Sequence, residues 1–335
     1  MRPSLSRRLA LIATMVSLTC LTALPGFARA QAQASVDKFP DHALKLLVPW
    51  PAGGATDVLS RIIAQKLGER LKQTVIVENK GGAGGNIGTT SFVKEKADGY
   101  NLLMATSSTN AANPYLYARL GFDPLKDFTP IAYVAAIPNI LEVPKNSRFN
   151  SAAELIKEAK DKPGTLNFGS GGVGASQHLA SSLLKTVADI NIVHVPYKGS
   201  GPAIVDLVSG QLDLVLDTGS LAQVKSGNLK ALAVASEKRL PALPDVPTFA
   251  ELGYPKMQAS AWYGIMAPAG LSPELTKFLN QEINAVLADP EVLKRIQDMG
   301  AIVSTGQTPA WFADFVRSEL VRYEQIVKNS GAKME

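Results

Sequence analysis

The sequence is short of cysteine, histidine and net charge, and each shortage excludes a class of function. It has one cysteine, Cys20, and three histidines in 335 residues. Cys20 lies in an apolar stretch that we expect to be removed, which leaves no disulfide, thiolate metal site or cysteine nucleophile. The histidines His42, His178 and His194 show no metal-ligand spacing, and no G-x-S-x-G elbow is present. The sequence therefore predicts no enzyme, no cofactor and no metal site.

The first 30 residues differ in composition from the rest of the chain. Arginines precede an apolar run of about 16 residues, Leu9–Leu24, which is shorter than the roughly 20 residues of a membrane span. The small residues Ala28 and Ala30 follow it. We expect a secretory signal peptide over 1–30, cut near Ala30, and a mature protein in the periplasm. An uncleaved anchor is the alternative, and Arg7–Arg8 leaves twin-arginine and general export both open.

Net charge is nearly balanced once this segment is removed. Four arginines and no acidic residue lie in it, so the formal charge of +5 falls to about +1. The remaining sequence has no run of lysine or arginine suited to nucleic acid or to an anionic membrane. We therefore expect no nucleic-acid partner.

The mature chain reads as strand, glycine loop and helix, repeated. Ala43–Val48 is a short apolar run followed by glycines and an amphipathic helix, and such alternation predicts an α/β fold with parallel sheets. About 305 residues exceed what one core usually holds. The segment Asp127–Lys145 has little helical pattern and suggests a crossing between lobes, with a return at Ala261–Met266. We expect lobe 1 over 36–142 plus 258–335 and lobe 2 over 143–257, joined by a hinge.

Four glycine- or hydroxyl-rich turns separate an expected strand from an expected helix. Such turns lie at the carboxyl edge of a parallel sheet, where ligands bind. The free N–H groups of the following helix favour an anion. Two turns from each lobe would hold a carboxylate without arginine, whereas the alternative is that the glycines only permit tight turns. The four turns are Trp50–Asp57, Gly81–Asn86, Gly169–Ser176 and Tyr197–Gly201.

Gly169, Gly171 and Gly174 form a literal G-x-G-x-x-G after an expected strand, a pattern that can mark a dinucleotide site. That site also requires an acidic residue at the end of the next strand. Tyr197 and Lys198 stand there instead, so we expect no dinucleotide.

Several side chains near these turns are candidates for ligand contact. Trp50 could stack on a ligand or fill the space under its turn. Asp57 could cap a helix or accept a ligand hydroxyl. His178 follows a glycine loop and could face the cleft or pack locally. The candidates are Trp50, Asp57, His178, Tyr197, Lys198 and Asp217.

The ordered set of motifs resembles the extracytoplasmic solute receptors of the tripartite tricarboxylate transporter family, the Bug-type proteins. The similarity covers essentially the whole mature chain, although Trp50 stands where relatives have phenylalanine or a similar residue. The motifs are Val48–Asp57, Val77–Asn86, Phe168–Gly174 with His178, Val195–Gly199, Pro244–Thr248 with Glu251 and Gly253, and Trp262–Pro268.

The resemblance implies a type II periplasmic binding protein fold of Venus-flytrap form, with two doubly wound lobes joined by a hinge. It implies a monomeric receptor that binds a small organic acid, chiefly through backbone N–H groups, and delivers it to membrane transporter subunits. A sensor that presents its closed form to a membrane kinase is the alternative, and a periplasmic enzyme is a third reading. The site residues that it implies are Ala52, Gly53, Thr56, Asp57, Gly84, Asn86, Ser107, Ser170, Gly172, Val173, Gly174, Ser176 and Tyr197.

Overall fold

The computed structural model describes residues 38–330, so the expected signal peptide lies outside the described residues. From His42 onward the chain forms one compact unit, and Lys38–Asp41 precede it. Strands and helices alternate as the sequence predicts. In chain order the elements are β1 (Leu44–Val48), α3 (Ala55–Leu71), β2 (Val75–Asn79), the 3-10 helix η1 (Ala83–Gly85), α4 (Asn86–Phe92), β3 (Asn101–Thr106), the π-helix η2 (Ser108–Ala112), α5 (Asn113–Leu116), β4 (Phe128–Pro138), β5 (Ile140–Pro144), α6 (Ala152–Asp161), β6 (Asn167–Ser170), α7 (Ser176–Ala188), β7 (Val193–Pro196), α8 (Ser200–Val208), β8 (Val215–Asp217), α9 (Leu221–Lys225), β9 (Leu229–Val234), β10 (Ser260–Pro268), α10 (Pro273–Ala288), α11 (Pro290–Asp298), β11 (Ile302–Val303) and α12 (Pro309–Ser330).

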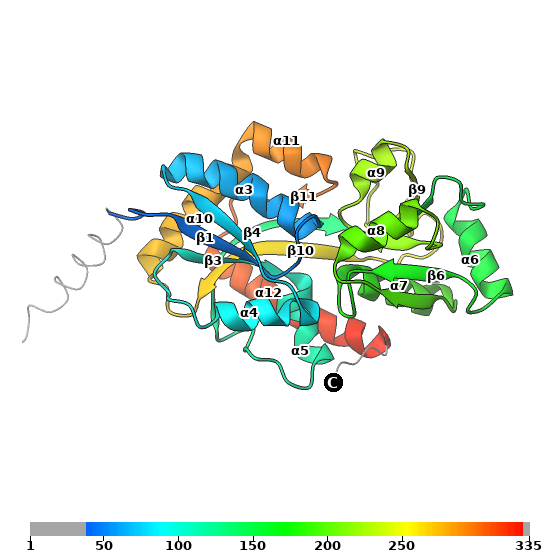
Figure 1. Cartoon of the computed structure of the whole chain (residues 1–335), viewed down its shortest axis with the longest axis horizontal. Coiled ribbons are helices and arrows are strands. Elements are labelled where there is room, and N and C mark those ends of the chain that lie inside the picture. The colour runs from blue at the N-terminus through cyan, green and yellow to red at the C-terminus, as the bar shows by residue number, and fades with distance from the viewer. Residues whose placement is uncertain (1–37, 331–335) are drawn as a thin grey trace, which may run out of the picture. The chain divides into compact units, whose positions relative to one another are not determined.

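The larger sheet has the strand order β11-β4-β10-β3-β1-β2. β1 pairs in parallel with β2 and β3, as expected, but β10 pairs antiparallel with both β3 and β4. The sheet is mixed because β4 leads the chain out toward the second sheet and β10 brings it back in the opposite direction. In Figure 1, α3, α10 and α11 lie over one face of this sheet, and α4 and α12 lie over the other.

The second sheet is built from short strands. β5 pairs antiparallel with β8 and β9, while β6 pairs in parallel with β7. A parallel bridge between Phe168 and Leu214 connects the two groups. Helices α6 to α9 surround them (Figure 1). A separate apolar core, including the fully buried Phe168, Phe249 and Leu155, supports this sheet.

Two crossings join the sheets, from β4 into β5 and from the segment after β9 into β10. Asn139 lies at the first crossing, and its backbone N–H donates to the carbonyl of Ala259 at the second, at 2.9 Å. Ala235 N–H donates to the carbonyl of Asn139 and Ala259 N–H to that of Ala235, so the connecting segments form one hydrogen-bonded group. The expected lobe boundary at 142/143 falls inside β5 and that at 257/258 just before β10. These boundaries stay a prediction.

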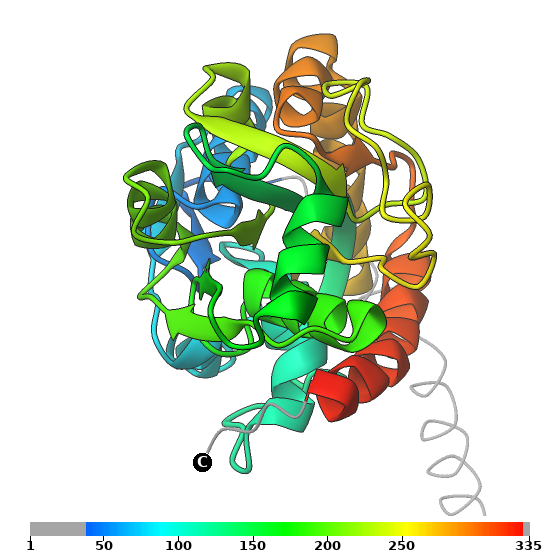
Figure 2. The same cartoon turned by 90° about the vertical axis from the view of Figure 1, so that its right-hand side faces the viewer.

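The C-terminal helix α12 also connects the two sides. Val316, Leu320 and Tyr323 of α12 share a core cluster with Trp262 of β10 and with Leu179 of α7. Figure 2 shows α12 in red along the edge of the unit. The helix that begins at the cleft, α7, therefore rests on α12.

Side chains cap the N-termini of α6, α10 and α11. Ser151 accepts a hydrogen bond from the Glu154 N–H, and the Glu154 carboxylate accepts one from the Asn150 N–H, which is close to a capping box. Ser272 and Asp289 cap α10 and α11 in the same way. Within residues 38–330, no helix combines the length and the apolar character that a membrane crossing requires.

Candidate ligand-binding site

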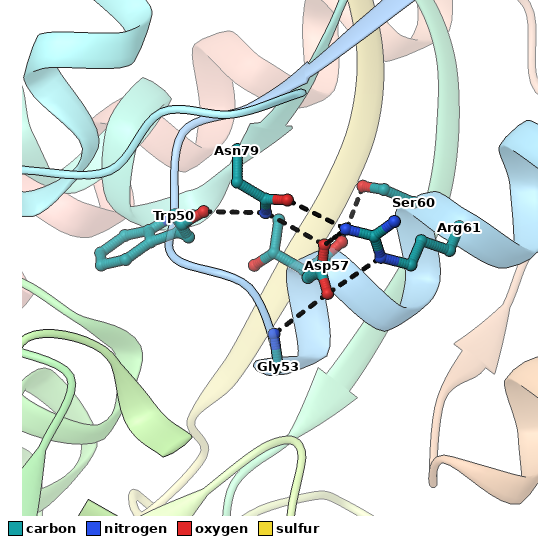
Figure 3. A network of polar contacts seen from close by, with 7 residues as sticks. Trp50, Gly53, Asp57, Ser60, Arg61 and Asn79 are labelled. Carbon is teal, nitrogen blue, oxygen red and sulfur yellow. Dashed lines mark hydrogen bonds and ion pairs between the residues drawn. The ribbon is translucent and has the colours of Figure 1, made fainter. Parts of the chain in front are cut away.

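The first turn is held rigid by Asp57, in the first turn of α3 (Figure 3). Its carboxylate accepts hydrogen bonds from the Gly53 N–H at 3.0 Å, from Asn79 Nδ2 at 3.0 Å and from Arg61 Nε at 3.1 Å. Asn79 Nδ2 also donates to the carbonyl of Trp50 at 3.1 Å. The side chain of Asp57 therefore fixes the path of the backbone from Trp50 to Gly53, whereas the N-cap of α3 is Gly54 and no side chain caps this helix.

Burial and hydrogen bonding act on the Asp57 carboxylate in opposite directions. Burial favours the neutral form, but the hydrogen bonds from Arg61, Gly53 and Asn79 outweigh it and hold the pKa of Asp57 below its usual value. The carboxylate is thus kept charged, and it repels a ligand anion less than a free carboxylate because Arg61 lies 3.0 Å from it.

The second turn, Gly81–Asn86, makes its polar contacts within the same side of the cleft. Asn113 Nδ2 donates to the carbonyl of Gly84 at 2.9 Å and to Asn86 Oδ1 at 2.7 Å. Gly84 and Gly85 have φ of +61° and +92°, which side chains rarely adopt. A Cβ at Gly84 would lie 3.4 Å from the carbonyl oxygen of Val173, across the cleft. This turn therefore meets the opposite loop, and Asn86 lines a different groove.

The third turn encloses a stack of buried aromatic rings. The rings of His178 and His194 are stacked with centroids 4.3 Å apart, next to Phe168. Ser170 Oγ lies 2.6 Å from His194 Nε2, and the Gly174 N–H donates to His178 Nδ1 at 3.3 Å. These contacts bind the loop 170–174 to the histidines beneath it.

Both histidines are held in the neutral form. Burial, together with the neighbouring His194, lowers the pKa of His178 to about 4. Burial likewise lowers the pKa of His194 to about 4. The ring of His178 packs against His194 and accepts a hydrogen bond from the Gly174 N–H.

The remaining candidates from the second sheet lie behind or beside the cleft. The Tyr197 hydroxyl donates to Asp206 at 2.7 Å, and Lys198 is exposed. Asp217 is buried and accepts from Gln177 Nε2 at 2.6 Å and from the Gly219 N–H at 2.7 Å. Asp217 thus positions Gln177, which does face the cleft.

A cavity lies between the two sheets. Of the seventeen residues proposed from sequence, five line the cavity: Trp50, Ala52, Thr56, Ser107 and Ser176. Lining residues that the sequence analysis did not name as candidates include Thr106, Ser108, Gln177, Ser200, Thr218 and Tyr263. The candidates outside the lining are Gly53, Asp57, Gly84, Asn86, Ser170, Gly172, Val173, Gly174, His178, Tyr197, Lys198 and Asp217.

Three helices begin at this cavity. Ala55 and Thr56 are the first residues of α3, Ser176 and Gln177 of α7, and Ser200 of α8, and all of them line it. The first N–H groups of a helix have no acceptor within the helix and carry the positive end of its dipole. None of the lining residues has a charged side chain. The cavity therefore offers partial positive charge from backbone only.

The two sides of the cavity are in contact. A Cβ at Gly54 would lie 3.0 Å from Ser200 Oγ, and a Cβ at Gly219 would lie 3.1 Å from the backbone nitrogen of Ala55. Tyr263 Oη lies 3.4 Å from Thr218 Oγ1 across the same boundary. This is a closed arrangement in which a ligand would be enclosed by both sheets.

The described residues offer little for catalysis at this site. Among residues 38–330, no cluster of three histidine, cysteine or carboxylate side chains could hold a metal ion. His178 on α7 and His194 on β7 stack on each other and form hydrogen bonds with the loop 170–174. The cavity wall supplies hydroxyls, amides and an indole, which are groups for binding.

Comparison with known proteins identifies the family and the fold. Residues 59–332 match the family model described as the tripartite tricarboxylate transporter family receptor. The structure of the periplasmic binding protein BugD superposes with a TM-score of 0.84 at 35% identity, covering 89% of this chain and all of that one. A structure of an R. palustris protein with adipate gives a TM-score of 0.85 at 35% identity, covering 88% of this chain and 100% of that chain. MatC from Rhodopseudomonas palustris with bound malate gives 0.81 at 31% identity, covering 86% and 100%. The expected α/β periplasmic binding protein fold is confirmed.

Proposed function

Because the chain belongs to the tripartite tricarboxylate transporter receptor family, we propose that it binds a small mono- or dicarboxylate in the cavity between its two sheets. In this proposal it then delivers the acid to the membrane subunits of a transporter. The chain is a solute receptor and a non-enzymatic binding protein, as the family and the related periplasmic structures have it. Export to the periplasm through the signal peptide at 1–30 is part of the proposal.

The observation that carries the carboxylate assignment is the convergence of three helix N-termini on a cavity with no charged side chain. Each N-terminus stabilises an anion by about 0.3–1 kcal/mol, and more when water is excluded. Three of them therefore favour an anion by about 1–3 kcal/mol, which corresponds to roughly 5- to 150-fold in affinity. A cation would gain nothing comparable from these groups.

The rest of the wall suits the uncharged body of such an acid. Trp50 presents an indole whose Nε1 lies 3.4 Å from Thr106 Oγ1, and Tyr263 closes the cavity from the large sheet. The hydroxyls of Ser107, Ser108 and Thr218 can donate to a second carboxylate or to a ligand hydroxyl. The relatives whose structures contain adipate and malate make dicarboxylates the first acids to test.

We assign ligand contact to the five predicted residues that line the cavity, and a positioning role to Asp57 and Asp217. The lobe division at 142/143 and 257/258 accompanies this assignment, because the ligand would be enclosed when the two lobes close about the hinge. The five contact residues are Trp50, Ala52, Thr56, Ser107 and Ser176.

A thermal-shift panel tests the proposal. The mature chain is melted with mono-, di- and tricarboxylates and with the primary amide of each acid. We expect at least one acid to raise the melting temperature, with a shift that grows with concentration as RT ln(1 + [L]/Kd). The matching amide should bind roughly 5- to 150-fold more weakly for the reason given above. Equal binding of acid and amide would contradict the carboxylate assignment.

A further inference from the structure

A second hollow lies outside the ligand cavity, and we call it the basic groove. It runs between the η1–α4 segment and the stretch that follows α5. Lys80, Ile87, Lys94, Tyr117 and Arg119 are among the residues that line it. The groove plays no part in the recognition of the solute described above.

Three cations surround the basic groove without a counter-charge. Lys80, Lys94 and Arg119 are exposed, and no aspartate or glutamate is among the lining residues. None of the three forms an ion pair with a carboxylate anywhere in residues 38–330. Many other surface lysines do, such as Lys66 with Asp289 at 2.9 Å and Lys328 with Glu324 at 2.6 Å. In a mature chain with a net charge of about +1, this concentration of unpaired positive charge creates a local potential that attracts acidic groups.

The basic groove also exposes apolar surface. The side chain of Ile87 is 54% exposed between the lysines of the groove. Cations beside an exposed aliphatic side chain offer a peptide segment both ion pairs and an apolar contact. The chemistry matches a loop that carries aspartate or glutamate beside an apolar residue.

Residues directly next to the basic groove approach the opposite loop. A Cβ at Gly174 would lie 2.7 Å from Leu116 Cδ1, and a Cβ at Gly84 would lie 3.4 Å from the carbonyl oxygen of Val173. Gly84 follows the groove residue Ala83 directly, and Leu116 precedes Tyr117. The opposite loop, at Val173 and Gly174, therefore lies beside the segments that form the groove.

We propose that the basic groove docks an acidic segment of the transporter's membrane component, and that it does so when the lobes are closed on solute. The inference rests on the proposed function, because it names where the receptor meets its transporter. Electrostatic attraction would speed the encounter and weaken with salt. Contact of Val173 and Gly174 with the residues next to the groove would make docking sensitive to the presence of solute.

Site-specific cross-linking tests the contact directly. Ile87 is replaced by a photo-reactive phenylalanine analogue in the full chain, expressed in the bacterium that makes it, with and without the acid that gives the largest shift in the melting panel. Val321, which is 66% exposed on α12, carries the same analogue as the control. We expect a solute-dependent adduct at position 87 to a peptide of the membrane component that contains aspartate or glutamate. An adduct to phospholipid, or no solute-dependent adduct, overturns the proposal.

Charge reversal tests the role of the basic groove in uptake. The variant K80E/K94E/R119E is compared with K160E/K238E/K256E, whose three lysines are exposed on the second-sheet side and unpaired within residues 38–330. A glutamine version of each triple variant guards against misfolding. We expect both sets to keep the melting shift with the acid, while the groove variants lower its uptake at least tenfold and the control variants do not.

The outcomes separate this inference from the function on which it rests. Full uptake by the groove variants overturns the docking site but leaves the receptor intact. Unchanged uptake in a strain that lacks the whole protein overturns both the transport role and the docking site.

Discussion

A side chain added at Gly54 should hinder closure of the cleft while leaving the fold intact. It is the N-cap of α3, with φ of −88°, a backbone conformation that any residue adopts. A Cβ there would lie 3.0 Å from Ser200 Oγ on the opposite side of the cavity. Valine adds two further carbon atoms at this point, so we expect Gly54→Val to create steric overlap in the closed arrangement only.

The size of the effect follows from overpacking. An inserted side chain costs about 1–3 kcal/mol in a well-packed site, which corresponds to a rise in Kd of about 5- to 150-fold. A form with the two sheets moved apart would not make this contact. Its stability should change only through the poorer N-cap, by about 1 kcal/mol.

A double-mutant cycle measures the contact. Kd for the best acid is determined by calorimetry for the wild type, Gly54→Val, Ser200→Ala and the double variant, together with the melting temperature of each without solute. We expect Ser200→Ala to recover part of the affinity that Gly54→Val loses, with a coupling of about 1 kcal/mol. An unchanged Kd for Gly54→Val, or a loss that Ser200→Ala does not relieve, would refute the closed arrangement.

Three further predictions concern buried ionisable groups. Burial lowers the pKa of His178 to about 4 from an ordinary value near 6.5. Above pH 6.5 the histidine is neutral in both the folded and the unfolded chain, so the free energy of unfolding is at its full value there. Up to about 3 kcal/mol of the free energy of unfolding is lost as pH falls to 4. In urea unfolding, His178→Gln should therefore lose less stability at acid pH than the wild type. Burial, and then the charge of Asp217, raise the pKa of Glu142 well above its usual value. Glu142→Gln should therefore leave the free energy of unfolding at pH 7 within about 1 kcal/mol, whereas Glu142→Ala should lose about 2–3 kcal/mol by urea unfolding. Asp57→Ala frees the Gly53 N–H, and we expect solute binding measured by calorimetry to weaken about tenfold, or 1.4 kcal/mol.

The alternation of strands and helices could be predicted because each element carries its own signal. The expected strand at 43–48 agrees with β1 to within a residue, and the expected return at Ala261–Met266 lies inside β10. The antiparallel placement of β10 was not predicted, because it depends on where the chain re-enters the large sheet. No local pattern in Ala261–Met266 encodes that direction.

The candidate site was harder to predict because sequence spacing does not show which groups a turn uses for itself. Asp57 and Asn86 have the residue types of ligand contacts, yet their side chains are bonded to Gly53 and Asn113. Ser200 lies inside the predicted turn Tyr197–Gly201 and lines the cavity, but it is not among the predicted site residues. A signal for it existed, because it directly follows the N-cap of α8.

The basic groove could not be seen in the sequence for a different reason. Lys80, Lys94 and Arg119 are separated by 14 and 25 positions, so no run of positive charge marks them. The three cations come together only in the fold, which places α4 beside the segment after α5.

The structure of the chain with its best acid tests the central claim most directly. We predict that the carboxylate oxygens lie within about 3.2 Å of backbone nitrogens at the starts of α3, α7 or α8, with both sheets in contact with the ligand. A carboxylate held instead by a lysine or arginine side chain, or bound outside the cavity, would contradict the account.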